Sequence, residues 1–174
     1  MKVSVAVASK HGSTQEIGEA IAAELAAQGH EPRLHDMATA SILDLDDSEA
    51  IIMGSAVYFG KWMMAASVFA QDISARVEGR PVWLFSTGPV GTPLKPADAQ
   101  NEIDVDEQIR MTGASEHKVF AGRVDKNQLR LGERSVVLAL RVQDGDYRDW
   151  DEVRDWARSI AGELTAQEQR QPVG

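Results

Sequence analysis

The fold of this chain is decided by the stretch Val3-Ser4-Val5-Ala6-Val7-Ala8-Ser9-Lys10-His11-Gly12-Ser13-Thr14-Gln15. Its apolar first half predicts a buried strand, and its second half predicts a short loop that opens directly into a helix. The first backbone N–H groups of a helix have no intrahelical partner, and the helix dipole adds about half a positive charge there. Hydroxyl groups and a glycine beside such a helix start favour a bound anion. The stretch therefore predicts a phosphate-binding loop made of Ser9, Lys10, His11, Gly12, Ser13 and Thr14.

The loop lacks the patterns of two common phosphate sites, the Gly-x-x-x-x-Gly-Lys P-loop and the Gly-x-Gly-x-x-Gly dinucleotide loop. It resembles instead the hydroxyl-rich phosphate loop of flavodoxins, which Ser9, Gly12 and Thr14 match. This resemblance implies FMN as the cofactor. Lys10 and His11 depart from the pattern, because flavodoxins usually neutralise this phosphate without a cationic side chain. The alternative is that Ser13 or Thr14 serves only as the N-cap of the helix.

The length and composition set limits on what this chain does. Its 174 residues suit one domain, which we expect to span 1–174 with a polar tail from about residue 168. The absence of cysteine excludes disulfides and dithiol redox chemistry, so any redox chemistry needs a cofactor. The histidines show no metal-ligand spacing, so we expect no metal site, and a net charge of −9 disfavours nucleic acid as a partner. The sequence has neither a signal-peptide pattern nor a long apolar stretch, so we expect a cytoplasmic protein.

Strand-like and helix-like apolar segments alternate along the chain, which predicts a parallel sheet with helices on both faces. We expect strands at 2–8, 33–36, 49–55, 82–86 and 117–121, and helices at 13–28, 62–76 and 149–167. Together with the resemblance above, this alternation predicts an α/β fold. The expected form is a flavodoxin-like three-layer sandwich whose five parallel strands lie in the order 2-1-3-4-5.

Two segments exceed a minimal five-stranded unit. Residues 88–113 form a long acidic excursion, whose run of acids predicts either a solvated face or a docking surface for a basic partner. Residues 126–143 carry basic side chains that fall on one stripe at helical spacing, so we favour a helix there over a strand. The stripe predicts either an amphipathic helix over the sheet edge or a peripheral contact with anionic lipid.

Ligands of open α/β sheets bind outside the carboxyl ends of the strands, where the strand order reverses. The loops after the first, third and fourth strands should therefore converge on one site. The latter two loops are rich in glycine and hydroxyl groups, which bring backbone N–H groups close to a planar flavin ring. Beyond the phosphate loop, the predicted cofactor-binding residues are Ser55, Ala56, Val57, Tyr58, Gly60, Ser86, Thr87, Gly88, Pro89, Val90 and Gly91.

Three aromatic residues follow the third strand. Tyr58, Phe59 and Trp62 are candidates to stack on the isoalloxazine ring, or else to pack against the start of the next helix. For Tyr58 we favour the flavin, whereas for Trp62 core packing is at least as consistent with the sequence. The loop after the fourth strand has no aromatic residue, so we expect one face of the flavin to stay open to a substrate.

Within the flavodoxin superfamily, the chain is similar to the menaquinone-dependent protoporphyrinogen dehydrogenase family. The passages 54–60, 119–123 and 149–153 carry this likeness, together with the position of residues 126–143. It implies an FMN-dependent oxidoreductase that passes electrons from a small organic substrate, protoporphyrinogen-like, to a quinone-type acceptor. It also implies at most a peripheral contact with the inner membrane face, through residues 126–143. The alternatives are an electron-carrier flavodoxin that docks a redox partner, and a flavodoxin-like module that has lost flavin binding; no catalytic residue is identified.

Overall fold

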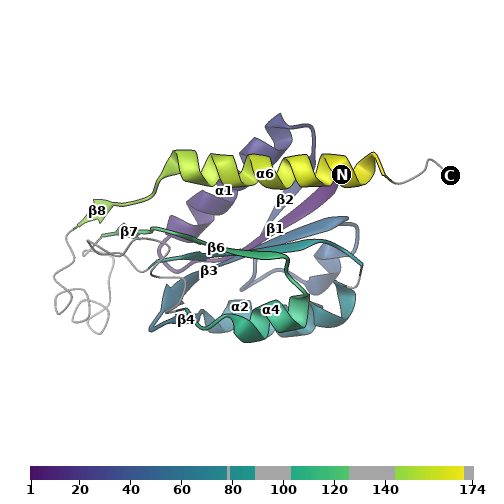
Figure 1. The fold of residues 1–174 in the computed structure, drawn as a ribbon. Coiled ribbons are helices and arrows are strands. Elements are labelled where there is room, and N and C mark those ends of the chain that lie inside the picture. Colours follow the sequence, from purple (N-terminus) through teal and green to yellow (C-terminus); the bar gives the residue numbers. More distant parts are fainter. Residues whose placement is uncertain (78, 89–102, 126–143, 171–174) are drawn as a thin grey trace.

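A computed structural model describes residues 1–77, 79–88, 103–125 and 144–170. Its central element is a parallel sheet made of β1 (Lys2–Ala8), β2 (Glu31–Asp36), β3 (Ala50–Tyr58), β5 (Val82–Thr87) and β6 (Glu116–Phe120). These strands lie in the order β2-β1-β3-β5-β6 (Figure 1). The order reverses between β1 and β3, which confirms the order predicted from the sequence.

Helices cover both faces of the sheet (Figure 1). One face carries α1 (Ser13–Ala27) and α6 (Trp150–Glu168), and the other carries α2 (Met64–Ile73) and α4 (Asp106–Thr112). Two short 3₁₀ turns, η1 (Ile42–Leu45) and η2 (Ser74–Arg76), complete the connections. The predicted three-layer α/β sandwich is therefore confirmed, with a separate apolar core on each side of the sheet.

The central strand β1 shows why the sequence folds in this way. Successive side chains of a strand point to opposite faces, so Val3, Val5 and Val7 pack under α1 and α6. Ala6 and Ala8 face the core beneath α2 instead. Because helices cover both faces of the sheet, both sets are buried, and the segment reads as a continuous run of small apolar residues.

The connection after β3 differs from the prediction. The strand continues to Tyr58, and β4 (Lys61–Trp62) turns back to pair with it in antiparallel fashion. Phe59 and Gly60 form the two-residue turn, with φ of 53° and 74°. Two left-handed residues are what the tightest hairpin turns need, because their twist matches that of the paired strands. The predicted helix 62–76 was therefore wrong at its start: α2 begins at Met64, after the hairpin, and ends in η2.

The acidic excursion contains a helix that the sequence reading missed. In α4, Asp106 and Glu107 occupy the first turn, and Gly113 ends the helix with φ of 64°. Gln108 and Thr112 are buried against the rest of the fold. So short a helix depends on packing rather than on intrinsic propensity, which leaves little periodic signal in the sequence. Residues 89–102, the earlier part of the excursion, lie outside the described residues.

A second, two-stranded sheet stands after β6. It pairs β7 (Arg123–Val124) with β8 (Gly145–Asp146) in antiparallel fashion. The predicted helix at 126–143, and the peripheral membrane contact expected of it, lie outside the described residues. Among the helices that the structure describes, none is both long and apolar enough to cross a membrane.

Candidate functional site

The start of α1 stands directly after the carboxyl end of β1. Gly12 is the N-cap residue, with φ of 82°, and no side chain caps the helix. Neither Ser13 nor Thr14 serves as the N-cap, so the alternative reading of these two residues as mere caps was wrong. A helix start without a side-chain cap presents its first N–H groups to an outside acceptor.

The Ser9 hydroxyl lies at the same junction. Its Oγ atom is buried and has no hydrogen-bond partner within the described part of the chain. Leaving such a group unsatisfied costs about 1–3 kcal/mol, so buried hydroxyls normally have partners. An anionic oxygen at the start of α1 would supply the missing acceptor. The junction therefore fits a phosphate group, which is the part of FMN that the sequence predicts here.

A direct contact joins the phosphate loop to the end of β5. The Thr14 and Thr87 hydroxyl oxygens lie 2.6 Å apart, and both residues are buried. One of the two hydroxyls donates to the other, so the pair keeps one proton that it can offer to a further acceptor. The ends of the first and fourth predicted strands therefore meet through a contact between two side chains, as predicted.

The β3–β4 hairpin reaches the phosphate loop through a second contact. The Lys10 ammonium lies 5.3 Å from the centroid of the Tyr58 ring. This distance is within the range of a cation–π interaction. Phe59, the next residue, has 84% of its surface exposed at the tip of the turn. The two neighbouring aromatics therefore differ: Tyr58 is half-buried beside the loop, and Phe59 faces solvent.

Trp62 belongs to the core. It is 5% exposed, packs in the apolar cluster beneath α2, and donates from Nε1 to the Ser86 Oγ over 2.8 Å. The Ser86 Oγ also lies 2.8 Å from Nε2 of His117. Burial lowers the pKa of His117 to about 4, so its imidazole is neutral at pH 7. Of the two roles considered for Trp62, the structure shows core packing.

The Ser55 hydroxyl is likewise used inside the fold. It accepts a hydrogen bond from the Met63 N–H over 3.0 Å and donates to the Ala56 carbonyl over 2.9 Å. This contact fixes the residue that precedes α2. The side chains of Ser55 and Ser86 thus act as structural links within the fold.

The other predicted cofactor-binding residues are placed by the strands. Ala56 stands opposite Thr87 in the pairing of β3 with β5, and Val57 stands opposite Trp62 in the hairpin. Gly88 has φ of 104° and donates its N–H to the Phe120 carbonyl. Pro89, Val90 and Gly91 lie outside the described residues.

Sequence reasoning missed a charged cluster against the start of α1. The side chain of Arg148 is 2% exposed, and its guanidinium binds both carboxylate oxygens of Asp146, at 2.7 and 2.6 Å. It also donates to Glu16 over 2.7 Å. Hydrogen bonds with Arg148 lower the pKa of Asp146 and, in return, raise that of Arg148. Glu16 and Arg148 are 132 positions apart, so no local pattern could have indicated their contact.

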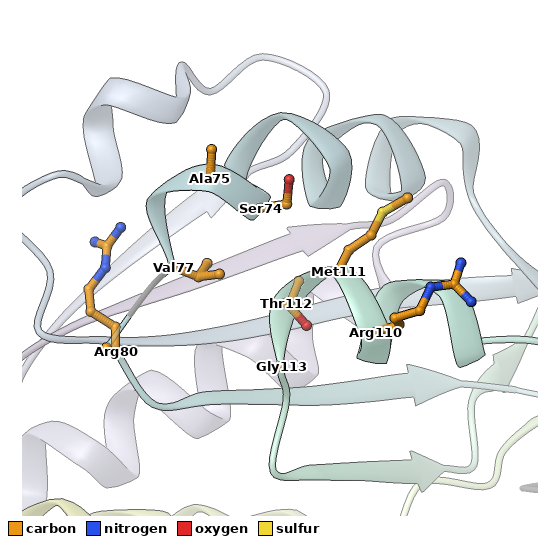
Figure 2. A pocket seen from close by; sticks show the side chains of 9 residues that line it. Ser74, Ala75, Val77, Arg80, Arg110, Met111, Thr112 and Gly113 are labelled. Carbon is orange, nitrogen blue, oxygen red and sulfur yellow. The ribbon is translucent and has the colours of Figure 1, made fainter.

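A cavity of about 450 Å³ lies at the opposite end of the sheet, before the first residues of β5 and β6. Figure 2 shows its two arginines, Arg80 and Arg110, on opposite sides of it. Arg80 donates to the carbonyls of Leu45 and Ser48 and so holds the η1 connection in place. Arg80 is thus used within the fold, and the lining residues that the structure describes include none from the loops after β1, β3 and β5.

Comparisons with known proteins agree with the fold. The model of a family described as flavodoxin domain matches residues 4–151. Proteins of this domain family bind FMN and serve flavin-based electron transfer, so the predicted cofactor is that of the family. No curated protein sequence matches the chain.

Solved structures extend the comparison. A flavodoxin from Streptococcus pneumoniae TIGR4 is 18% identical, with a TM-score of 0.62, over 96% of this chain and 99% of that one. Oxidised flavodoxin 2 from Bacillus cereus is 21% identical, with a TM-score of 0.61, over 94% of this chain and 99% of that one. The rubredoxin oxygen:oxidoreductase of Desulfovibrio gigas is 15% identical, with a TM-score of 0.63, over 95% of this chain but 36% of that larger protein. At these identities the likeness shows the fold alone.

Proposed function

The chain belongs to the flavodoxin-domain family, and we propose that it binds FMN at the carboxyl ends of β1, β3 and β5 for use in oxidation and reduction. The observation that carries this proposal is the buried, unsatisfied Ser9 hydroxyl beside a helix start that no side chain caps. When bound, FMN supplies a group that takes up and releases one or two electrons. The protein supplies position and electrostatics.

Different residues bind the phosphate and the ring of FMN. The Ser9 hydroxyl, the first N–H groups of α1 and the Thr14–Thr87 pair hold the phosphate. The Tyr58 ring packs against the flavin ring, while Lys10 holds a positive charge between the two halves of the site. The backbone of residues 55–57, 60 and 86–88 completes the ring site.

The substrate side of the proposal rests on exposed apolar surface. Phe59 and Met64 are 84% and 80% exposed beside the β3–β4 hairpin. Large apolar side chains that face solvent next to a cofactor site favour an apolar organic molecule as reaction partner. We therefore assign the chain a two-electron oxidation of a small organic substrate, protoporphyrinogen-like, with a quinone-type acceptor. Two electrons and two protons leave the substrate, and the same number converts the quinone to its hydroquinone.

An electron carrier is the second candidate. Asp106 and Glu107 at the start of α4 are exposed, and Asp104 beside them has 66% of its side chain exposed. With the net charge of −9, this acidic face suits a basic redox protein.

Anaerobic mixing of the FMN-loaded protein with a reduced tetrapyrrole separates the two candidates. An enzyme loses its visible flavin bands within the mixing time, whereas a carrier keeps them until a protein partner is added.

The binding proposal is tested by titrating the purified protein with FMN and following the visible absorption spectrum. We expect saturable shifts of the flavin bands, and Thr14→Ala should weaken binding by about 1–3 kcal/mol because a hydrogen bond to a charged group is lost. Thr165→Ala is the matched control, since its hydroxyl bonds within α6 to the Ala161 carbonyl. If the wild type gives no shift, the chain is a flavodoxin-like module without flavin. An unchanged affinity in Thr14→Ala removes Thr14 from the site.

A further inference from the structure

The first turn of α1 carries a carboxylate that two arginines hold. Glu16 Oε2 lies 2.7 Å from Arg148 Nη1, and Glu16 Oε1 lies 3.0 Å from Arg123 Nη1. Both arginines come from the β7–β8 sheet and the residues beside it. The backbone of Arg123 also donates to the Ser13 Oγ over 3.1 Å, and Arg148 Nη1 donates to the Ser13 carbonyl over 3.4 Å. Hydrogen bonds and ion pairs thus connect the β7–β8 region to the first turn of α1, the helix that follows the phosphate loop.

Without those arginines, Glu16 would compete with a bound phosphate. A carboxylate in the first turn of a helix is itself stabilised by the positive end of the dipole. The Glu16 carboxylate lies close to the loop, because its Oε1 is 3.8 Å from the point where a Cβ on Gly12 would stand. Two anions at one helix start repel each other, and the repulsion falls when cations neutralise one of them.

We propose that Arg148 and Arg123 are positioning residues that make the flavin site selective for the phosphorylated cofactor, by holding and neutralising Glu16 at the start of α1. This inference rests on the proposed FMN function. It assigns to residues after β6 a part in recognising the phosphate, although neither arginine stands in the loop that the sequence predicts as the phosphate site.

The burial of Arg148 supports a fixed rather than an adaptable cation. Its side chain is 2% exposed, while those of Glu16 and Asp146 are 38% and 42% exposed. The guanidinium also lies 4.4 Å from the Trp150 ring centroid. An arginine with a paired carboxylate on each side and an aromatic face against it is held in a single orientation. The cluster therefore costs little further ordering when an anion binds beside it.

The test compares the affinities of FMN and riboflavin, which share the ring and differ in the phosphate. In Arg148→Met, we expect the FMN affinity to fall about tenfold while the riboflavin affinity stays within about twofold. Glu16→Gln should change the ratio of FMN to riboflavin affinity in the opposite direction, so that FMN is favoured several-fold more than in the wild type. Arg148→Lys keeps the charge but loses the two-pronged contact, so it should fall between Arg148→Met and the wild type.

Arg158→Met is the matched control. Arg158 is likewise an arginine paired with a glutamate of α1, Glu24, whose Oε1 lies 3.1 Å from Arg158 Nε, but this pair lies further along the helix from the phosphate loop. Its FMN to riboflavin ratio should equal that of the wild type. If Arg148→Met does not fold, Glu16→Gln and Arg148→Lys still test the proposal, because they should shift the ratio of FMN to riboflavin affinity in opposite directions.

Three outcomes distinguish a failure of the proposed phosphate selectivity from a failure of the proposed FMN binding. Opposite shifts of the ratio in Arg148→Met and Glu16→Gln support phosphate selectivity. Equal losses of FMN and riboflavin affinity in both variants would overturn it, since they indicate a purely structural role. A wild type that binds neither flavin contradicts the proposed function itself, independently of what the variants do.

Discussion

Gly54→Ala tests the packing between β3 and β5. Gly54 stands opposite Phe85 in the strand pairing, and a Cβ built on it would lie 2.0 Å from Cζ and 2.2 Å from Cε1 of that ring. The Phe85 ring cannot easily retreat. It is fully buried, and its centroid lies 6.0 Å from each of the Phe120 and Trp156 rings.

The size of the effect follows from this overlap. Adding atoms to a well-packed core typically costs 1–3 kcal/mol, occasionally more, because side chains leave their rotamers or the backbone shifts. The added methyl group overlaps three ring atoms of a side chain that two other aromatic rings confine, so we expect about 3 kcal/mol. For a domain of this length, that loss lowers Tm by about 6–12 °C.

The assay is urea unfolding followed by tryptophan fluorescence, with the free energy of unfolding extrapolated to water. Gly162→Ala in α6 is the control, because a Cβ there meets nothing within 4 Å. It should stabilise the protein by about 0.5–1 kcal/mol through helix propensity. A double variant that combines Gly54→Ala with Phe85→Leu should recover part of the stability that Gly54→Ala alone loses. If Gly54→Ala stays within about 0.5 kcal/mol of the wild type, the packing argument is refuted.

Three further outcomes are expected. Because burial lowers the folded-state pKa of His117 to about 4, its contribution to stability is complete above pH 6.5 and is lost as the pH falls toward 4. The loss should be about 2 kcal/mol after allowance for partial solvent screening, and urea unfolding of His117→Gln between pH 7.5 and 4.5 should show a flatter profile. Ser86→Ala removes the partner of the Trp62 Nε1–H and should destabilise by about 1–3 kcal/mol in the same assay. Ser74→Ala, whose hydroxyl bonds at the surface, should stay close to the wild type; equal losses would contradict this reasoning. Asp149→Ala removes the N-cap of α6 and should lower Tm by an amount equivalent to about 1 kcal/mol, and an unchanged Tm would count against the cap.

Much of the fold could be predicted because its signals are local. The β1 strand was predicted at its observed bounds, and α1 begins at the predicted residue, since the change from apolar run to loop to helical stripe occurs within fifteen residues. The stripe of Ile17, Ile21 and Leu25 is fully buried, as the helical period requires. Periodicity of this kind reports burial directly, whatever the element packs against.

The hairpin after β3 and the helix α4 could not be predicted in the same way. The segment 55–62 has the glycine and hydroxyl content of a loop, yet the structure pairs it into a strand end and β4. Tight pairing depends on Phe59 taking up a left-handed φ, which an aromatic residue rarely does. The α4 helix depends on burying its inner face against α2, where Gln108 contacts Ser67. Both elements follow from tertiary contacts that outweigh local preference.

The candidate site shows the same division. The sequence by itself determined the loop Ser9–Thr14 at the end of a buried strand, because a strand, a hydroxyl-rich turn and a helix start are specified by neighbouring residues. Only the tertiary structure decided that Thr14 meets Thr87, that Lys10 lies over Tyr58, and that Ser55 and Ser86 are used within the fold. It also decided that Glu16 is held by arginines more than one hundred positions away. Local order along a chain specifies where backbone donors gather, but the charges and hydroxyls around them are brought together by sheet order and helix packing.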